Sequence, residues 1–181
     1  RGHQWPGSVD CQLQRWNHVR LSFTERRYFG SCRHALSRLC HRSRRHTAAT
    51  PHIHCTVFSP DGKYIFATDF SADRILRFVM HPDNPIPHAS LEAVGIEADS
   101  GPRHLTFSPN GKFAYLITEL SGKVIAFSYD DGRLEQIQTI TADTVAARGS
   151  ADIHLSPDGK YLYASNRLKE DGIAIFAVNP E

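Results

Sequence analysis

Four residues supply the groups needed to open an ester-like bond in an anionic substrate: His54, Arg103, Glu119 and Arg167. Two guanidinium groups can hold a carboxylate or phosphate through paired hydrogen bonds and oppose the charge that develops on a carbonyl oxygen. A histidine titrates near neutral pH, and a carboxylate beside it can orient it or share in proton transfer. These four residues are the predicted catalytic set.

The four residues occupy two fixed positions of an internal repeat. A Ser-Pro-Asp/Asn-Gly-Lys motif begins at Ser59, Ser108 and Ser156, so its copies are 49 and then 48 residues apart. Five residues before the serine the sequence has His54, Arg103 and Ala151. Eleven residues after it the sequence has Phe70, Glu119 and Arg167. The first position opens a strand and the second closes its antiparallel neighbour, which predicts that both lie at one face of the fold.

Three further residues flank this set and are predicted to bind substrate: His52, His104 and Asn166. His104 falls one place out of register with Arg103, so simple alternation along a strand predicts that it faces the other way. A purely structural interpretation stays open, in which Arg103 and Glu119 form an ion pair within one sheet and His54 caps the preceding loop. The repeated serines are interpreted as turn residues rather than nucleophiles.

A period of 40–50 residues made of short strands is typical of β-propeller blades. The Asp-Gly and Asn-Gly pairs favour tight hairpin turns. In the middle repeat, residues 104–107, 112–119, 123–129 and 134–141 are expected to form four antiparallel strands, which make one blade. The predicted fold is therefore all-β, with about three blades of a β-propeller over residues 51–181. A β-sandwich of short strands is the alternative fold. Because closed propellers need at least four blades, we expect the chain to be a fragment.

Residues 1–50 have a different composition from the rest of the chain. They contain ten arginines, no lysine and only two acidic residues, and carry three of the four cysteines. A short amphipathic helix is one interpretation of residues 28–39. An Arg-rich run at residues 41–46 is compatible with a nucleic-acid-binding arm, and Cys32, His34, Cys40, His41 and His46 are compatible with a zinc site. We favour the hypothesis that this basic segment is disordered or read out of frame.

The remaining expectations concern cofactors, cellular location and binding partners. No cofactor or metal is predicted, because the aspartates of the repeats fit turns rather than a calcium loop. No apolar stretch is long enough to cross a bilayer and no signal peptide is apparent, which predicts a cytoplasmic protein with no membrane or nucleic-acid partner. The expected partner is a small anionic molecule with an ester-like bond.

The motifs of residues 51–181 resemble those of the lactonase-type seven-bladed propeller family, which includes propeller-form 6-phosphogluconolactonases and fungal carboxy-muconate lactonizing enzymes. The motifs that carry the resemblance are Pro51-His52-Ile53-His54, Gly101-Pro102-Arg103-His104, Glu119-Leu120 and Ser165-Asn166-Arg167. The resemblance implies a metal-free lactone site at one face of the central channel. It implies a catalytic histidine at His54, arginines at Arg103 and Arg167, and a glutamate at Glu119.

The leading functional hypothesis from these observations is lactone hydrolysis, with 6-phosphogluconolactone of the pentose phosphate pathway as the substrate. In that hypothesis the two arginines bind the anionic group and polarise the carbonyl, while His54, assisted by Glu119, activates water. Lactonization of a muconate, the reverse reaction, is one alternative. A non-catalytic binding platform is another, since many propellers only bind.

Overall fold

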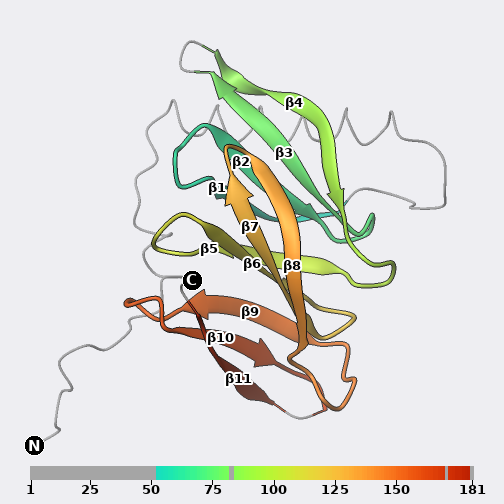
Figure 1. The fold of residues 1–181 in the computed structure, drawn as a ribbon. Helices are drawn as coiled ribbons and strands as arrows, with labels where there is room; N and C mark the ends of the chain where they lie inside the picture. The colour runs from blue at the N-terminus through green and yellow to red at the C-terminus, as the bar shows by residue number, and fades with distance from the viewer. Residues whose placement is uncertain (1–51, 82–83, 170, 180–181) are drawn as a thin grey trace, which may run out of the picture.

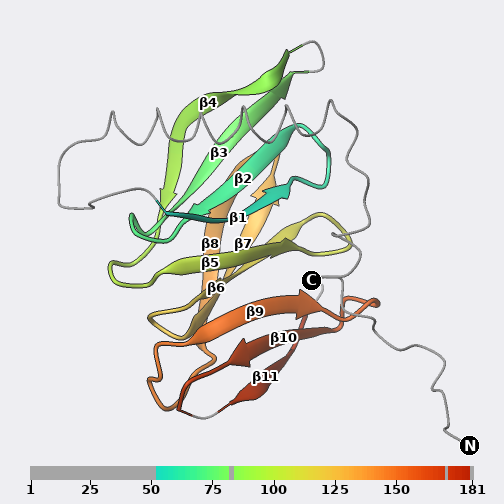
Figure 2. The ribbon, with the colours of Figure 1, turned by 180° about the vertical axis from the view of Figure 1, so that it is seen from behind.

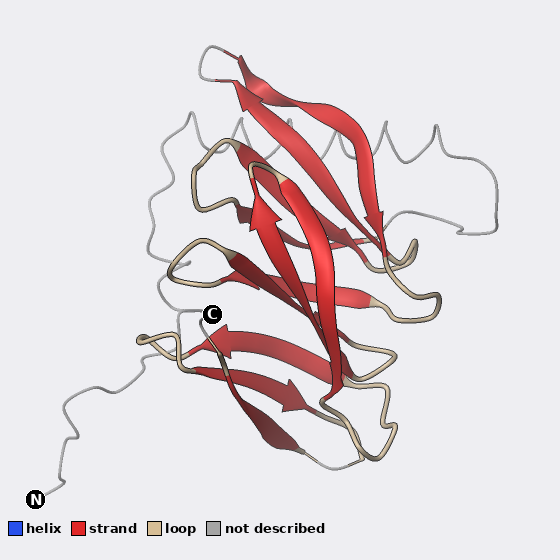
Figure 3. Ribbon diagram, in the orientation of Figure 1, coloured by secondary structure: helices blue, strands red, loops and turns tan. Residues whose placement is uncertain are grey.

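The computed structural model describes residues 52–81, 84–169 and 171–179, and strands and loops account for all of them (Figure 3). The predicted interpretations of residues 1–50, including the helix, the zinc site and the basic arm, lie outside this part of the chain. No helix long and apolar enough to cross a membrane occurs among the described residues.

Eleven strands form three antiparallel sheets, which we call the first, second and third blades. The first blade contains β1 (Ile53–Phe58), β2 (Tyr64–Asp69), β3 (Arg74–His81) and β4 (Asn84–Gly95). The second contains β5 (Pro102–Phe107), β6 (Phe113–Thr118), β7 (Lys123–Asp130) and β8 (Arg133–Thr141). The third contains β9 (Ser150–Leu155), β10 (Tyr161–Asn166) and β11 (Gly172–Ala177). The predicted blades, and the four strands of the middle one, are confirmed.

The blades stack face to face, with β1, β5 and β9 as neighbouring inner strands (Figures 1 and 2). One apolar core fills the space between the first and second blades and includes Phe66, Ile75 and Phe127. A second core lies between the second and third blades and includes Ile117 and Ile153. The middle blade is therefore buried on both faces, which explains why β6 is apolar at successive positions instead of alternating.

The repeated serine closes the turn between the first two strands of each blade. Its hydroxyl accepts a hydrogen bond from the backbone N–H five residues later, at 3.0 Å in all three blades. The glycine of the motif adopts a positive φ of 71–72°, which side chains disfavour. Ser59, Ser108 and Ser156 are almost fully buried, as expected for turn residues rather than nucleophiles.

The face of the third blade that points away from the second carries exposed apolar side chains. Ile173 and Ile175 on β11 are 65% and 63% exposed, whereas Ala174 and Phe176, at the alternate positions, pack toward the second blade. In a closed propeller a neighbouring blade would cover such an apolar face.

Candidate active site

A β-bulge lies at the same place in the inner strand of every blade. The pairing register shifts at His54 in β1, at Arg103 in β5 and at residues 151–152 in β9. Two residues of the inner strand then oppose one residue of its neighbour, so the alternation of side chains between the two faces is interrupted and the local side chains are re-aimed. The bulge is the local feature that shapes the candidate site.

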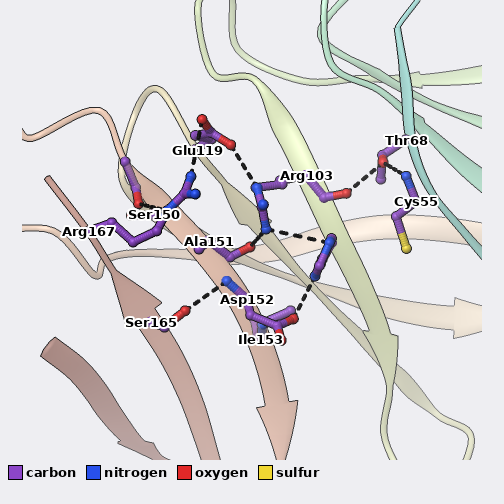
Figure 4. Close-up of polar contacts among 12 residues, drawn as sticks. Cys55, Thr68, Arg103, Glu119, Ser150, Ala151, Asp152, Ile153, Ser165 and Arg167 are labelled. Atoms are coloured by element: carbon purple, nitrogen blue, oxygen red, sulfur yellow. Dashed lines mark hydrogen bonds and ion pairs between the residues drawn. The ribbon is translucent and has the colours of Figure 1, made fainter. Parts of the chain in front are cut away.

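Glu119 joins two arginines from different blades (Figure 4). Its Oε2 atom lies 2.7 Å from Nε of Arg103, and its Oε1 atom lies 3.4 Å from a terminal nitrogen of Arg167. The Arg103 and Glu119 side chains are 16% and 23% exposed, whereas that of Arg167 is 46% exposed. The predicted ion pair within the blade therefore exists, and it is extended by an arginine that solvent and ligands can reach.

Arg103 is connected to all three blades. Its backbone carbonyl accepts a 2.7 Å hydrogen bond from the hydroxyl of Thr68, which in turn accepts one from the N–H of Cys55. Its Nη1 atom donates to the carbonyl of Ala151 in the third blade. Figure 4 shows this chain of contacts running across the inner strands. The guanidinium is consequently fixed before any ligand binds, as electrostatic stabilisation of a transition state requires.

His54 lies beside the ring of His104, with a distance of 5.1 Å between ring centroids, and 6.4 Å from the ring of Phe70. Burial lowers the pKa of His54, and the nearby positive charge of Arg103 lowers it further. The imidazole is therefore neutral at neutral pH and able to accept a proton. Glu119 acts on it only at a distance, through its charge, because its carboxylate is engaged by the two arginines.

His104 lies on the same side as Arg103, contrary to the expectation from strand alternation. Its Nε2 atom is 3.5 Å from Nη1 of Arg103, and its Nδ1 atom is 2.6 Å from Oδ1 of Asp152 in the third blade. The bulge at Arg103 is the physical reason, because it breaks the two-residue period just before His104. Sequence reasoning missed Asp152, although the repeat held a signal: four residues before the blade serines stand Cys55, His104 and Asp152.

The other two predicted substrate-binding residues stand apart from this cluster in their contacts. The ring of His52 is exposed and meets Phe70 edge-on, with centroids 6.1 Å apart. The amide of Asn166 accepts a hydrogen bond from the hydroxyl of Ser150 at 2.6 Å and donates one to the carbonyl of Ala142 at 2.7 Å. These contacts favour a supporting role for Asn166, because both atoms of its amide are already paired with protein.

The arrangement combines the fixed positive charge of Arg103 with the neutral imidazole of His54 at one face of the inner strands. A guanidinium that is held rigidly can stabilise an oxyanion, and an adjacent imidazole can take a proton from water. Within the described ranges, no group of three or more His, Cys, Asp or Glu side chains is placed to hold a metal ion. The chemistry that the described residues can supply is hydrolysis assisted by charge and proton transfer.

Residues 30–181 match the family model described as lactonase, 7-bladed β-propeller. A 6-phosphogluconolactonase of Formosa agariphila is 42% identical over 135 residues, which cover 72% of this chain and 38% of that protein. A crystal structure of a candidate 6-phosphogluconolactonase from Bacteroides uniformis is 99% identical, with a TM-score of 0.72, and the match covers 74% of this chain and 39% of that one. The structure of a periplasmic gluconolactonase from Pseudomonas aeruginosa is 38% identical, with a TM-score of 0.68 and the same coverage. The chain thus spans about two fifths of the length of these relatives.

Proposed function

Because this chain belongs to the family of seven-bladed β-propeller lactonases, we propose that the complete protein hydrolyses a sugar lactone. The specific substrate that we propose is 6-phosphogluconolactone, the lactone named in the 42% identical relative from Formosa agariphila. A sugar phosphate carries charge that an apolar bilayer excludes, so the same proposal places the protein in the cytoplasm.

The observation that carries the proposal is the bridge that Glu119 makes between Arg103 and Arg167. The bridge shows that guanidinium groups from two blades reach the oxygens of a single anion. Arg167 is the more exposed of the two and would meet the anionic group of the substrate. Arg103, which is fixed on three sides, would face the carbonyl oxygen as negative charge develops there.

The reaction that follows from this geometry has two steps. A water oxygen attacks the lactone carbonyl carbon while one of its protons passes to a neutral imidazole, and the resulting oxyanion is stabilised by Arg103. The bond from the carbonyl carbon to the ring oxygen then breaks, and the imidazolium returns the proton to that oxygen. Two imidazoles lie side by side for this step: His54, the base predicted from the sequence, which its lowered pKa keeps neutral, and His104.

The test compares 6-phosphogluconolactone with unphosphorylated gluconolactone, using a full-length seven-bladed relative that carries residues 52–179 of this chain. We expect R103A to lower kcat about 10²–10³-fold on both lactones, and R167A to raise KM mainly for the phosphorylated one. H54A should lower kcat, whereas R133A, at a 77% exposed arginine on the outer strand β8, serves as the matched control.

Two results would contradict the proposal. Wild-type kcat in both R103A and H54A would remove the catalytic assignment of these residues. A wild-type protein that turns over no lactone would favour a binding platform, and one that only forms a lactone from a muconate would favour the reverse reaction.

A further inference from the structure

Asp152 and His104 form a carboxylate–imidazole pair across the boundary between the second and third blades. Nδ1 of His104, on β5, lies 2.6 Å from Oδ1 of Asp152, on β9. The two side chains are 31% and 45% exposed, so the pair is partly shielded from water. A contact this short between a ring nitrogen and a carboxylate is a charge-assisted hydrogen bond, and it places the hydrogen of the imidazole on Nδ1.

Two other contacts hold the carboxylate of Asp152 in place, and a third holds its backbone. Oδ1 accepts a 2.9 Å hydrogen bond from the N–H of Ile153, and Oδ2 lies 2.9 Å from Nε2 of His154. The N–H of Asp152 donates to the hydroxyl of Ser165 at 2.9 Å. The hydrogen bond from His104 keeps the pKa of Asp152 well below its usual range, so the carboxylate stays ionised. An ionised and immobile acceptor fixes both the rotation and the tautomer of its imidazole partner.

The other nitrogen of His104 faces the catalytic arginine. Nε2 lies 3.5 Å from Nη1 of Arg103, which is at the outer limit of a hydrogen bond. Nη1 already donates to the carbonyl of Ala151. The lone pair of Nε2 therefore lies next to the guanidinium that would face the developing oxyanion, and it is only weakly engaged there.

We propose that Asp152 is a positioning residue that holds His104 with its hydrogen on Nδ1, and that Nε2 of His104 is the base that takes a proton from the attacking water. This inference rests on the proposed lactone hydrolysis and assigns one group within it. In the first step a water proton moves to Nε2 as the new carbon–oxygen bond forms. In the second step Nε2–H returns the proton to the ring oxygen as the lactone carbon–oxygen bond breaks, and Asp152 stays ionised throughout.

A base needs a defined nitrogen that is free to accept a proton, and His54 and His104 differ in whether a hydrogen bond defines one. In the part of the chain that the structure describes, the His54 ring makes ring contacts with His104 and Phe70, but no hydrogen bond holds either of its nitrogens. Without such a bond neither tautomer is selected. His104 is therefore the imidazole whose proton-accepting atom is defined by the fold.

Several titratable or charged groups surround His104, and they come from each element that packs against it. His54, Arg103 and Asp152 lie next to His104 itself. His154 and Cys55 interact with Asp152, Glu119 pairs with Arg103, and Arg167 pairs with Glu119. We expect D152N to change the pH profile of kcat, because it replaces the ionised carboxylate that accepts from Nδ1 of His104.

The experiment measures kcat, KM and pH profiles for D152N, H104Q and the double variant in the same full-length relative. D158N is the matched control, because Asp158 is an exposed turn carboxylate that accepts from Ser156 and Lys160. We expect H104Q to lower kcat about 10²–10³-fold and D152N about 10²-fold, with KM changed less than about twofold. The double variant should be no slower than H104Q, since both changes act on one group.

A second measurement does not depend on turnover. Nitrogen-15 NMR of the wild-type imidazoles should show His104 with hydrogen on Nδ1 and a bare Nε2, and D152N should lose this preference. Wild-type His104 with hydrogen on Nε2 would overturn the inference, and so would kcat in D152N equal to that in D158N. An active wild type with an equally active H104Q would refute this inference alone, whereas a wild type that opens no lactone would refute the proposed function as well.

Discussion

The two ion pairs of Glu119 should differ measurably in strength. The pair with Arg103 has a 2.7 Å contact between side chains that are 16% and 23% exposed. The pair with Arg167 has a 3.4 Å contact to a side chain that is 46% exposed. Removing Glu119 as E119Q, or either arginine as R103Q and R167Q, breaks these contacts while keeping the approximate size of each side chain.

The expected coupling energies follow from geometry and exposure. A short hydrogen bond between charged and shielded groups contributes about 1.5–3 kcal/mol, so we expect a coupling of about 2 kcal/mol between Arg103 and Glu119. An exposed pair typically contributes about 0.2–1 kcal/mol, which is the range expected for Arg167 and Glu119. The predicted difference of at least about 1 kcal/mol exceeds the usual error of a double-mutant cycle.

The assay is urea unfolding of the wild type, the three single variants and the two double variants in the full-length relative, with kcat measured on the same samples. A coupling for Arg167 that equals or exceeds that for Arg103 would refute the reasoning from distance and burial. Wild-type kcat in R103Q and E119Q, combined with a strong coupling in stability, would show that the pair is only structural.

Two further predictions concern the surroundings of the site. Lowering the pH from 7 to 5 should reduce the Tm of the wild type more than that of H54Q. The pKa of His54 is lowered in the folded protein, so the unfolded chain, in which a histidine has a pKa near 6.5, takes up the proton first. The contribution of neutral His54 to stability is therefore complete above pH 6.5 and is lost below it, and equal Tm changes in the two proteins would contradict the prediction. T68V should destabilise the protein by about 1–3 kcal/mol in urea unfolding, because the carbonyl of Arg103 loses the hydroxyl of the buried Thr68 that donates to it. T68S keeps that hydroxyl and should cost less, so a T68S variant as unstable as T68V would argue against the hydrogen bond.

The repeat made most of this fold predictable. The spacing of Ser59, Ser108 and Ser156 locates each hairpin, and the strands of the middle blade were expected within two residues of their observed limits. Turn geometry is local, because it depends on a glycine with positive φ and a serine that bonds five residues ahead, and local features can be read from sequence. Placing His54, Arg103, Glu119 and Arg167 at one face needed only the radial equivalence of repeat positions.

The contacts within that face could not be predicted in the same way. Strand alternation placed His104 away from Arg103, since a bulge is a property of pairing between two strands and leaves no clear mark in one of them. The leading hypothesis paired Glu119 with His54, whereas the ion pair with Arg103, which was the structural alternative, is the one observed, and Arg167 adds to it. Asp152 was missed because its carboxylate acts across a blade boundary on a residue 48 positions earlier.

The recurring bulge has a consequence for how a propeller of this kind can change its chemistry. A regular inner strand would offer the channel one side chain for every two residues, but the bulge lets two consecutive residues, such as Arg103 and His104, reach the same space. These two positions lie outside the apolar cores that hold the blades together. A substitution at either position therefore changes the polar contacts of the site while it leaves the apolar cores between the blades as they are.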